Sequence, residues 1–143
     1  MDNLRGGGAC MKFKDTVTVF NRLKVGNTIT YNKIVIKKAL WFDSVSSSLL
    51  KQGIVDLNAK TIYIPRSQAF SSEYILPESY ERLTDGTGFF TLNNGDYIGK
   101  GEITLEEGET VQGYKNRTGK LYEIKSVSDY DMGINNHFEV IAD

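Results

Sequence analysis

Apolar and polar residues alternate in several short stretches of the chain, a period-two pattern that is typical of β-strands with one buried face. The segment 15–20 places its valines on one face and its threonines on the other. The segment 28–43 continues the alternation and is long enough for two strands, with a bend expected near Asn32 or Lys38. Both segments are therefore predicted to be extended.

The same pattern predicts strands further along the chain. They are expected at residues 60–65, 89–92, 96–105, 121–130 and 136–142. Asn93-Asn94-Gly95 favours a tight turn, because Asn and Gly tolerate positive φ, so a hairpin is predicted between 89–92 and 96–105. The last two segments are expected to form the closing pair of the sheet.

Helical signals are few. Residues 44–53 have a serine to begin a helix and a glycine to end it, and residues 77–83 open with Pro77 and an acidic first turn. Neither segment could cover a sheet alone. The sequence therefore predicts a mainly β fold, a single compact antiparallel β-barrel or sandwich with one or two short helices.

The first ten residues differ from the rest, since they lack alternation and contain three consecutive glycines. We expect residues 1–10 to be a disordered or non-native extension, with Met11 as the natural start, and residues 11–143 to form one β-rich domain.

Composition narrows the classes of function. Seventeen Lys and Arg against eighteen Asp and Glu give a net charge of −1, which weakens the case for a general nucleic-acid binder. The sequences NRLK and KNRTGK are locally positive and are interpreted as solvated turns, with a local basic patch as the alternative. Cys10, the single cysteine, has no partner for an internal disulfide. No apolar run approaches the roughly 20 residues that span a bilayer, and the N-terminal residues are not expected to act as a secretory signal.

The stretch from 126 to 140 holds the single histidine, His137, near the carboxylates of Asp129, Asp131 and Glu139. Its spacing resembles the start of a calcium loop, but isoleucine stands where the loop needs glycine, and valine where it needs glutamate. One histidine without cysteines is too little for zinc. The sequence thus predicts no catalytic residue, no metal site and no cofactor; a hydrolase using His137 with Asp129 or Glu139 stays as a minor hypothesis.

Aromatic residues interleaved with lysines offer a further alternative. Tyr31 and Trp41 could stack bases on an OB-like barrel that binds single-stranded nucleic acid. The same side chains also suit core or sheet-face positions.

The chain as a whole resembles the small minor head, or head–tail connector (head-closure), proteins of tailed bacteriophages and prophages. It opens with KDTVTVFN, carries KKALWFD, and closes with a strand of I-x-S-V-x-D type and a polar loop before a final strand. The matching residues are Ile124, Ser126, Val127, Asp129, His137, Phe138, Val140 and Ile141. Tyr130-Asp131 and Phe138 depart from the more frequent Asn-Arg and Trp.

The resemblance implies a structural, non-enzymatic assembly protein that forms a ring with copies of itself between the portal or adaptor and the tail proteins. Its place would be the bacterial host cytoplasm during assembly and then the virion neck. DNA would be met at most in the ring lumen, with no membrane contact and no small-molecule substrate.

Two polar segments, 44–58 and 66–88, are the expected interaction surfaces. The candidate partner-binding residues, from the second segment and the terminal loop, are Phe70, Tyr74, Tyr80, Tyr130 and Met132. Buried aromatic anchors often concentrate the energy of an interface. An equally open interpretation is that half of the aromatic residues in segment 66–88 roof the barrel.

Overall fold

The computed structural model describes residues 13–43, 59–130 and 136–143. The predictions for residues 1–10, for a helix at 44–53 and for Met132 lie outside these residues. Within them the fold is mainly β, with an antiparallel six-stranded sheet and two short helices. The predicted fold class is confirmed.

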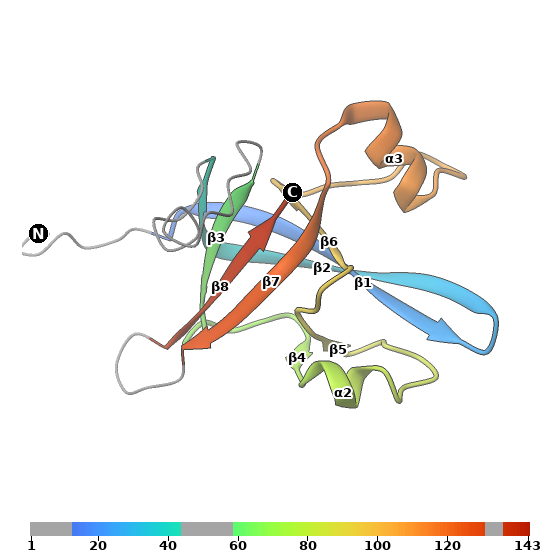
Figure 1. The fold of residues 1–143 in the computed structure, drawn as a ribbon, viewed down its shortest axis with the longest axis horizontal. Coiled ribbons are helices and arrows are strands. Elements are labelled where there is room, and N and C mark those ends of the chain that lie inside the picture. Colours follow the sequence, from blue (N-terminus) through green and yellow to red (C-terminus); the bar gives the residue numbers. More distant parts are fainter. Residues whose placement is uncertain (1–12, 44–58, 131–135) are drawn as a thin grey trace, which may run out of the picture.

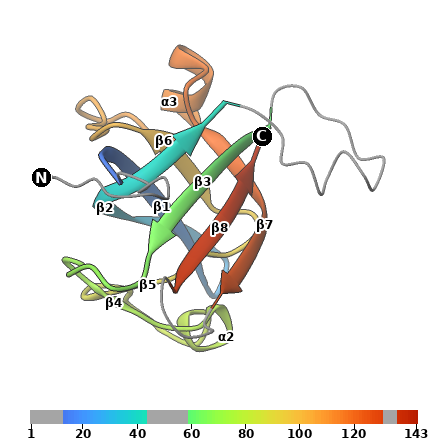
Figure 2. The ribbon, with the colours of Figure 1, turned by 90° about the vertical axis from the view of Figure 1, so that its left-hand side faces the viewer.

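The six strands pair in the order β1-β2-β3-β8-β7-β6, and β6 pairs with β1 again, so the sheet curls into a small barrel rather than a two-sheet sandwich (Figures 1 and 2). Their bounds are β1 (Asp15–Val25), β2 (Thr28–Phe42), β3 (Lys60–Pro65), β6 (Tyr97–Lys100), β7 (Tyr122–Tyr130) and β8 (His137–Ala142). The ring of strands closes over a short length, because β6 and β7 share two residue pairs. The enclosure is therefore partial.

The core lies inside this barrel and follows the predicted alternation. Val17, Val19, Ile62, Ile64 and Val140 are each 0% exposed. Aliphatic side chains that alternate along each strand meet in one apolar cluster, and their removal from water is the main stabilising contribution to the fold.

The opposite face of β1 is covered as well, although the alternation predicted a strand with one buried face. Thr18 is 0% exposed. Its hydroxyl donates to the Gly101 carbonyl over 2.7 Å and accepts from the Ile103 amide over 2.9 Å. The chain that follows β6 therefore covers this face, and the hydroxyl supplies the hydrogen bonds that its burial requires.

Two small lobes flank the barrel (Figure 1). The first holds β4 (Glu73–Tyr74), α2 (Pro77–Tyr80) and β5 (Phe89–Phe90), where β4 and β5 run parallel. The second holds α3 (Val111–Thr118), which was not predicted. Thr110 caps α3 by accepting from the Gly113 amide, and Gly119 ends it with φ of 65°. These two residues are the sequence signal that could have located the helix.

Three predicted boundaries were wrong. The segment 28–43 forms one strand, β2, and not two, although its register with β1 shifts between Ile36 and Ala39, beside the expected bend at Lys38. β1 extends to Val25, so NRLK is strand and not a turn. The predicted hairpin between 89–92 and 96–105 does not form: the chain turns at Asn93–Asp96, but β5 pairs with β4 and β6 pairs with β1 and β7.

Candidate functional site

The most prominent feature of the molecule is a two-stranded arm, residues 21–32, that projects beyond the barrel (Figure 1). It exists because β6 pairs only with Val17–Phe20 of β1, so the rest of β1 and the start of β2 have only each other as strand partners. Gly26, with φ of 63°, lies in the tight turn at the tip, where a left-handed backbone favours glycine. Val25 and Ile29 at the tip are 39% and 45% exposed.

A buried polar cluster holds the base of the arm. The Asn21 amide donates to the Thr91 carbonyl over 2.7 Å and to the Asp96 carboxylate over 2.9 Å, while the Thr91 amide donates back to Asn21 over 3.1 Å. The Arg22 amide donates to Asp96 over 3.0 Å. Asp96 is 3% exposed. These bonds link the arm to the turn before β6 and to the chain after β5.

Burial raises the pKa of Asp96 to about 6, although the donors from Arg22, Asn21 and Asn93 oppose that rise. A carboxylate taken out of water is disfavoured relative to its neutral form, which is why the pKa lies above its ordinary value. The titration of Asp96 is therefore expected to change the stability of the arm's base in the mildly acidic range.

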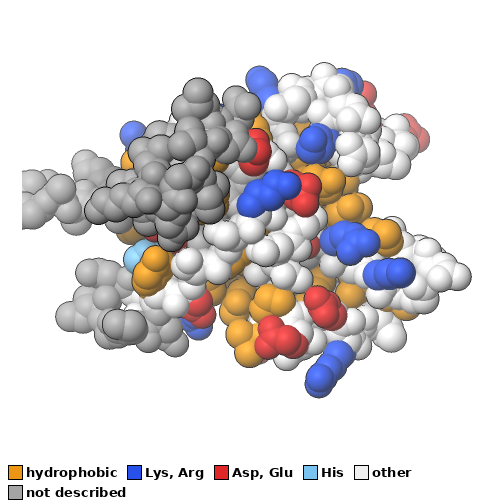
Figure 3. All heavy atoms as spheres, in the orientation of Figure 1, with side chains coloured by type: hydrophobic (Ala, Val, Ile, Leu, Met, Phe, Trp, Pro, Cys, Tyr) orange, Lys and Arg blue, Asp and Glu red, His pale blue; other side chains and the backbone are white. Residues whose placement is uncertain are grey.

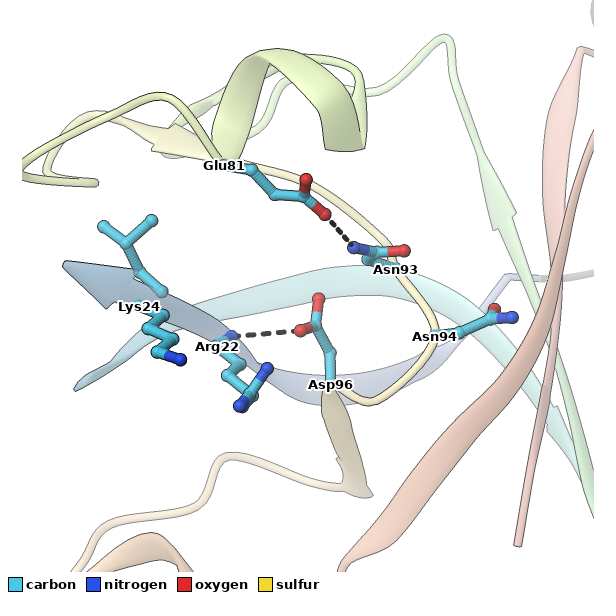
Figure 4. Close-up of a pocket in the computed structure, with 7 residues that line it drawn as sticks. Arg22, Lys24, Glu81, Asn93, Asn94 and Asp96 are labelled. Atoms are coloured by element: carbon cyan, nitrogen blue, oxygen red, sulfur yellow. Dashed lines mark hydrogen bonds between the residues drawn. The ribbon is translucent and has the colours of Figure 1, made fainter. Parts of the chain in front are cut away.

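Beside this cluster lies a cavity of about 220 Å³ between the arm and the first lobe (Figure 4). Its walls combine cationic, acidic and amide side chains: Arg22, Leu23, Lys24, Glu81, Asn93, Asn94 and Asp96. In Figure 4 the Arg22 and Lys24 side chains point away from Glu81, and Asp96 is already bonded to the Arg22 amide. The polar group at the base of this cavity, Asp96, thus helps to attach the arm to the turn before β6.

A second exposed surface lies on the outer face of the barrel, across β2, β3, β8 and β7. Four rings, the aromatic strip, follow one another there: Phe42, Tyr63, His137 and Tyr130. Their centroids are 5.5, 5.5 and 5.0 Å apart in that order. Phe42 is 38% exposed and Tyr130 is 45% exposed. The neighbouring strands β3, β8 and β7 can be followed in Figure 2.

The predicted partner-binding residues fall into different environments. Tyr80 is 1% exposed, and its hydroxyl accepts from the Asn32 amide over 2.8 Å. Phe70 and Tyr74 are half-buried and pack on the core, with ring centroids 5.0 and 5.5 Å from Phe90. Phe70 and Tyr74 thus cover the barrel core, whereas Tyr80 is buried between the first lobe and the arm. Tyr130 belongs to the aromatic strip.

Of the acidic and imidazole groups of the terminal stretch, Asp129, His137 and Glu139 belong to the described residues, and Asp131 lies outside them. Both carboxylate oxygens of Asp129 accept from Nη1 of Arg66, over 2.5 and 2.6 Å. The Arg66 guanidinium lies 4.9 Å from the centre of the Phe138 ring. His137 lies between the rings of Tyr63 and Tyr130 on the outer face. Within the described ranges, no group of three or more His, Cys, Asp or Glu is placed to hold a metal ion.

The aromatic residues of the OB-like alternative are partly covered. Trp41 is 8% exposed, and its indole N–H donates to Asp43 over 2.9 Å. It lines a cavity of about 380 Å³ at the end of the barrel, together with Asp43, Lys100, Gly101, Lys120 and Tyr122. Tyr31 is half-buried and lies 5.8 Å, centroid to centroid, from Tyr97 on the outer face.

Of the comparisons with known proteins, one gives a match, and this match covers residues 12–143. No curated protein matches the chain, and no solved structure matches it. None of the helices in the described part of the chain is long and apolar enough to cross a membrane. A family model described as "Family of unknown function (DUF6751)" matches residues 12–143, and the chain therefore belongs to this family.

Proposed function

We propose that the protein is a structural assembly subunit, a head–tail connector or minor head protein that forms a ring between the phage portal and the tail. The proposal joins the sequence resemblance with the distribution of exposed apolar side chains. The observation that carries it is that the molecule offers two different apolar surfaces, the arm tip and the aromatic strip.

These two surfaces lie at opposite ends of the molecule. In Figure 1 the arm extends to the right, whereas the end of β7 and the start of β8, which carry Tyr130 and His137, lie at the left. A head-to-tail contact between copies needs two different surfaces facing away from each other, and it makes a closed ring when the rotation between copies closes. The positions of the arm tip and the aromatic strip meet that geometric need.

The chemistry of the two surfaces is also complementary. The arm tip presents the aliphatic side chains of Val25 and Ile29 on the two opposite faces of a narrow hairpin. The aromatic strip presents flat rings that run across four strands. Aliphatic groups that pack on aromatic rings at the centre of an interface are a common source of its energy.

The experiment is light scattering after size exclusion, with the full chain alone and mixed with the portal protein of the same phage or prophage. The wild type is expected to enter a ring-sized complex with the portal. Val25→Ser with Ile29→Ser is expected to prevent this, since serine removes the apolar tip. Leu76→Ser is the matched control, because Leu76 is 53% exposed but lies away from both surfaces, at the start of α2. A wild type that stays monomeric with portal and tail proteins would contradict the proposal.

A further inference from the structure

The arm belongs to a long stretch of the sequence in which every charged residue is positive. From Thr16 to Phe42 the chain contains no Asp or Glu and five cationic residues, Arg22, Lys24, Lys33, Lys37 and Lys38. The whole protein has a net charge of −1, so the positive charge is a local feature of this stretch of the sequence. Figure 3 shows Lys and Arg side chains along the projecting arm and acidic side chains on the lobe below it.

The two cations of the arm itself share one face. Arg22 and Lys24 are two residues apart on β1 and both are exposed, so their side chains leave the same side of the strand, about 7 Å apart. Leu23, between them, points to the other side and is 2% exposed. Figure 4 shows the Arg22 and Lys24 side chains directed away from Glu81 and the first lobe. The cationic face is therefore the outer face of the arm.

Tyrosine rings lie directly beside these cations. Tyr31 is the cross-strand partner of Arg22, so the two side chains lie next to each other on the same face of the arm. Tyr97 extends this edge onto β6, and its hydroxyl donates to Gln112 of α3 over 3.2 Å. A surface of guanidinium, ammonium and phenol groups matches the groups that proteins commonly use to bind phosphate oxygens.

Of the two cations of this face, Arg22 has the Asp96 carboxylate nearby, and the interaction of their charges acts to lower the pKa of Asp96. Among the residues that the structure describes, neither Arg22 nor Lys24 forms an ion pair. The acidic residues after β6 are partly engaged elsewhere, since Glu106 and Glu109 pair with Arg117 at 3.7 and 2.7 Å. The charge of the arm is thus available to an anionic partner.

We propose that the outer face of the arm, Arg22 and Lys24 with Tyr31 and Tyr97 beside them, binds the phosphate backbone of duplex DNA without reading its sequence. This deepens the connector proposal, because it assigns the arm as the element that faces DNA. Two phosphate contacts per subunit are weak alone. Repeated around a ring, they act together at a high effective concentration.

The test is a polarisation titration of the full chain with a labelled DNA duplex over a series of salt concentrations, starting at about 20 mM, where surface charges are little screened. Arg22→Gln with Lys24→Gln is the test variant. Arg82→Gln with Lys125→Gln is the matched control, because it removes the same net charge from two exposed residues elsewhere. The same oligonucleotide as a single strand is measured beside the duplex.

The wild type and the control variant are expected to bind the duplex alike. The test variant is expected to bind at least about tenfold more weakly at low salt, with a slope of log affinity against log salt that is smaller by about two. Equal losses in the test and control variants would overturn the proposal, as would binding of the single strand alone or no binding below about 100 µM protein at low salt.

Measuring assembly with the portal distinguishes a failure of the DNA inference from a failure of the connector proposal on which it rests. Ile29 is the cross-strand neighbour of Lys24, but the test variant keeps Val25 and Ile29 and changes only two polar side chains, so it is expected to form the portal complex as the wild type does. Retained assembly with unchanged DNA affinity would overturn the DNA inference and leave the connector proposal standing. If the wild type does not assemble with the portal but binds DNA through Arg22 and Lys24, the connector proposal alone is overturned.

Discussion

The barrel and the arm are built from the same two strands, yet they obey different constraints. In the barrel, the inner halves of β1 and β2 bury Val19 and Ile34 against the other strands. In the arm the same strands lose these neighbours, and Val25 and Ile29 are exposed. The comparison teaches that burial fixes side-chain identity in the barrel and at the base of the arm, whereas the side chains at the arm tip are exposed and can contact other molecules.

The largest expected effect tests the barrel side of the comparison. Phe138→Ala removes a ring that is 1% exposed and packs against Tyr74 at 4.7 Å. The substitution leaves a cavity, so the free energy of unfolding is expected to fall by about 3–5 kcal/mol. Urea unfolding followed by circular dichroism measures it. A loss below about 1 kcal/mol would mean that the barrel interior is not packed as described.

The next effect concerns the junction of barrel and arm, where Asp96 has a pKa of about 6. The folded protein holds the Asp96 proton more tightly than the unfolded chain, whose carboxyl has the ordinary value of 3.8. The stability that this group contributes is therefore present below pH 3.8 and lost as the pH rises through about 6. Asp96→Asn removes this dependence.

The measurement is the free energy of unfolding of wild type and Asp96→Asn between pH 4 and pH 7. The wild-type value minus the variant value is expected to fall across this range by on the order of 2–3 kcal/mol. A difference that does not vary with pH would show that Asp96 is not buried at the base of the arm.

A smaller effect is expected where the first lobe meets the arm. Tyr80→Phe removes the hydroxyl that accepts from the Asn32 amide over 2.8 Å, while the ring stays buried. The loss of one hydrogen bond is expected to cost about 1 kcal/mol in the free energy of unfolding. Assembly with the portal is expected to be unchanged, because only 1% of the Tyr80 surface is exposed. Impaired assembly at unchanged stability would show instead that Tyr80 meets a partner.

The smallest effect on stability is expected at the arm tip. Ile29→Ser changes a side chain that is 45% exposed, so the free energy of unfolding should move by no more than about 0.5 kcal/mol. The same variant is expected to weaken assembly with the portal, because it removes half of the apolar tip. Light scattering of the mixture, with Leu76→Ser as control, measures the effect. Normal assembly of Ile29→Ser would remove the arm tip from the interface.

Much of the fold could be predicted from the sequence, because alternation reports burial on one face. β3 and the closing pair β7–β8 were located nearly to the residue. The hydrophobic pattern failed at residues 21–25. This part of β1 has one exposed face, which carries arginine and lysine. These residues are also common in turns, so the segment was interpreted as a turn. The pattern also failed at β5, whose partner β4 is a two-residue strand set by tertiary packing.

The candidate surfaces could be predicted only in part. Tyr130 was selected from its apolar character in a polar stretch, and it lies in the aromatic strip. Val25 and Ile29 were missed, because an exposed aliphatic residue in a strand has the same sequence pattern as a buried one. Tyr80 was selected as a partner residue although it is buried. Its ring is covered by contacts with Gly86 and Asn32. These two residues are distant in the sequence from each other, and the contacts form only in the folded protein.

The contact between the arm tip and the aromatic strip can be tested most directly by cross-linking. Two single variants, Ile29→Cys and Tyr130→Cys, are made in a chain with Cys10→Ser, assembled with the portal, and treated with a short thiol cross-linker. The account predicts covalent dimers when the two variants are mixed and none from either variant alone. Dimers from Ile29→Cys alone, or none from the mixture, would contradict it.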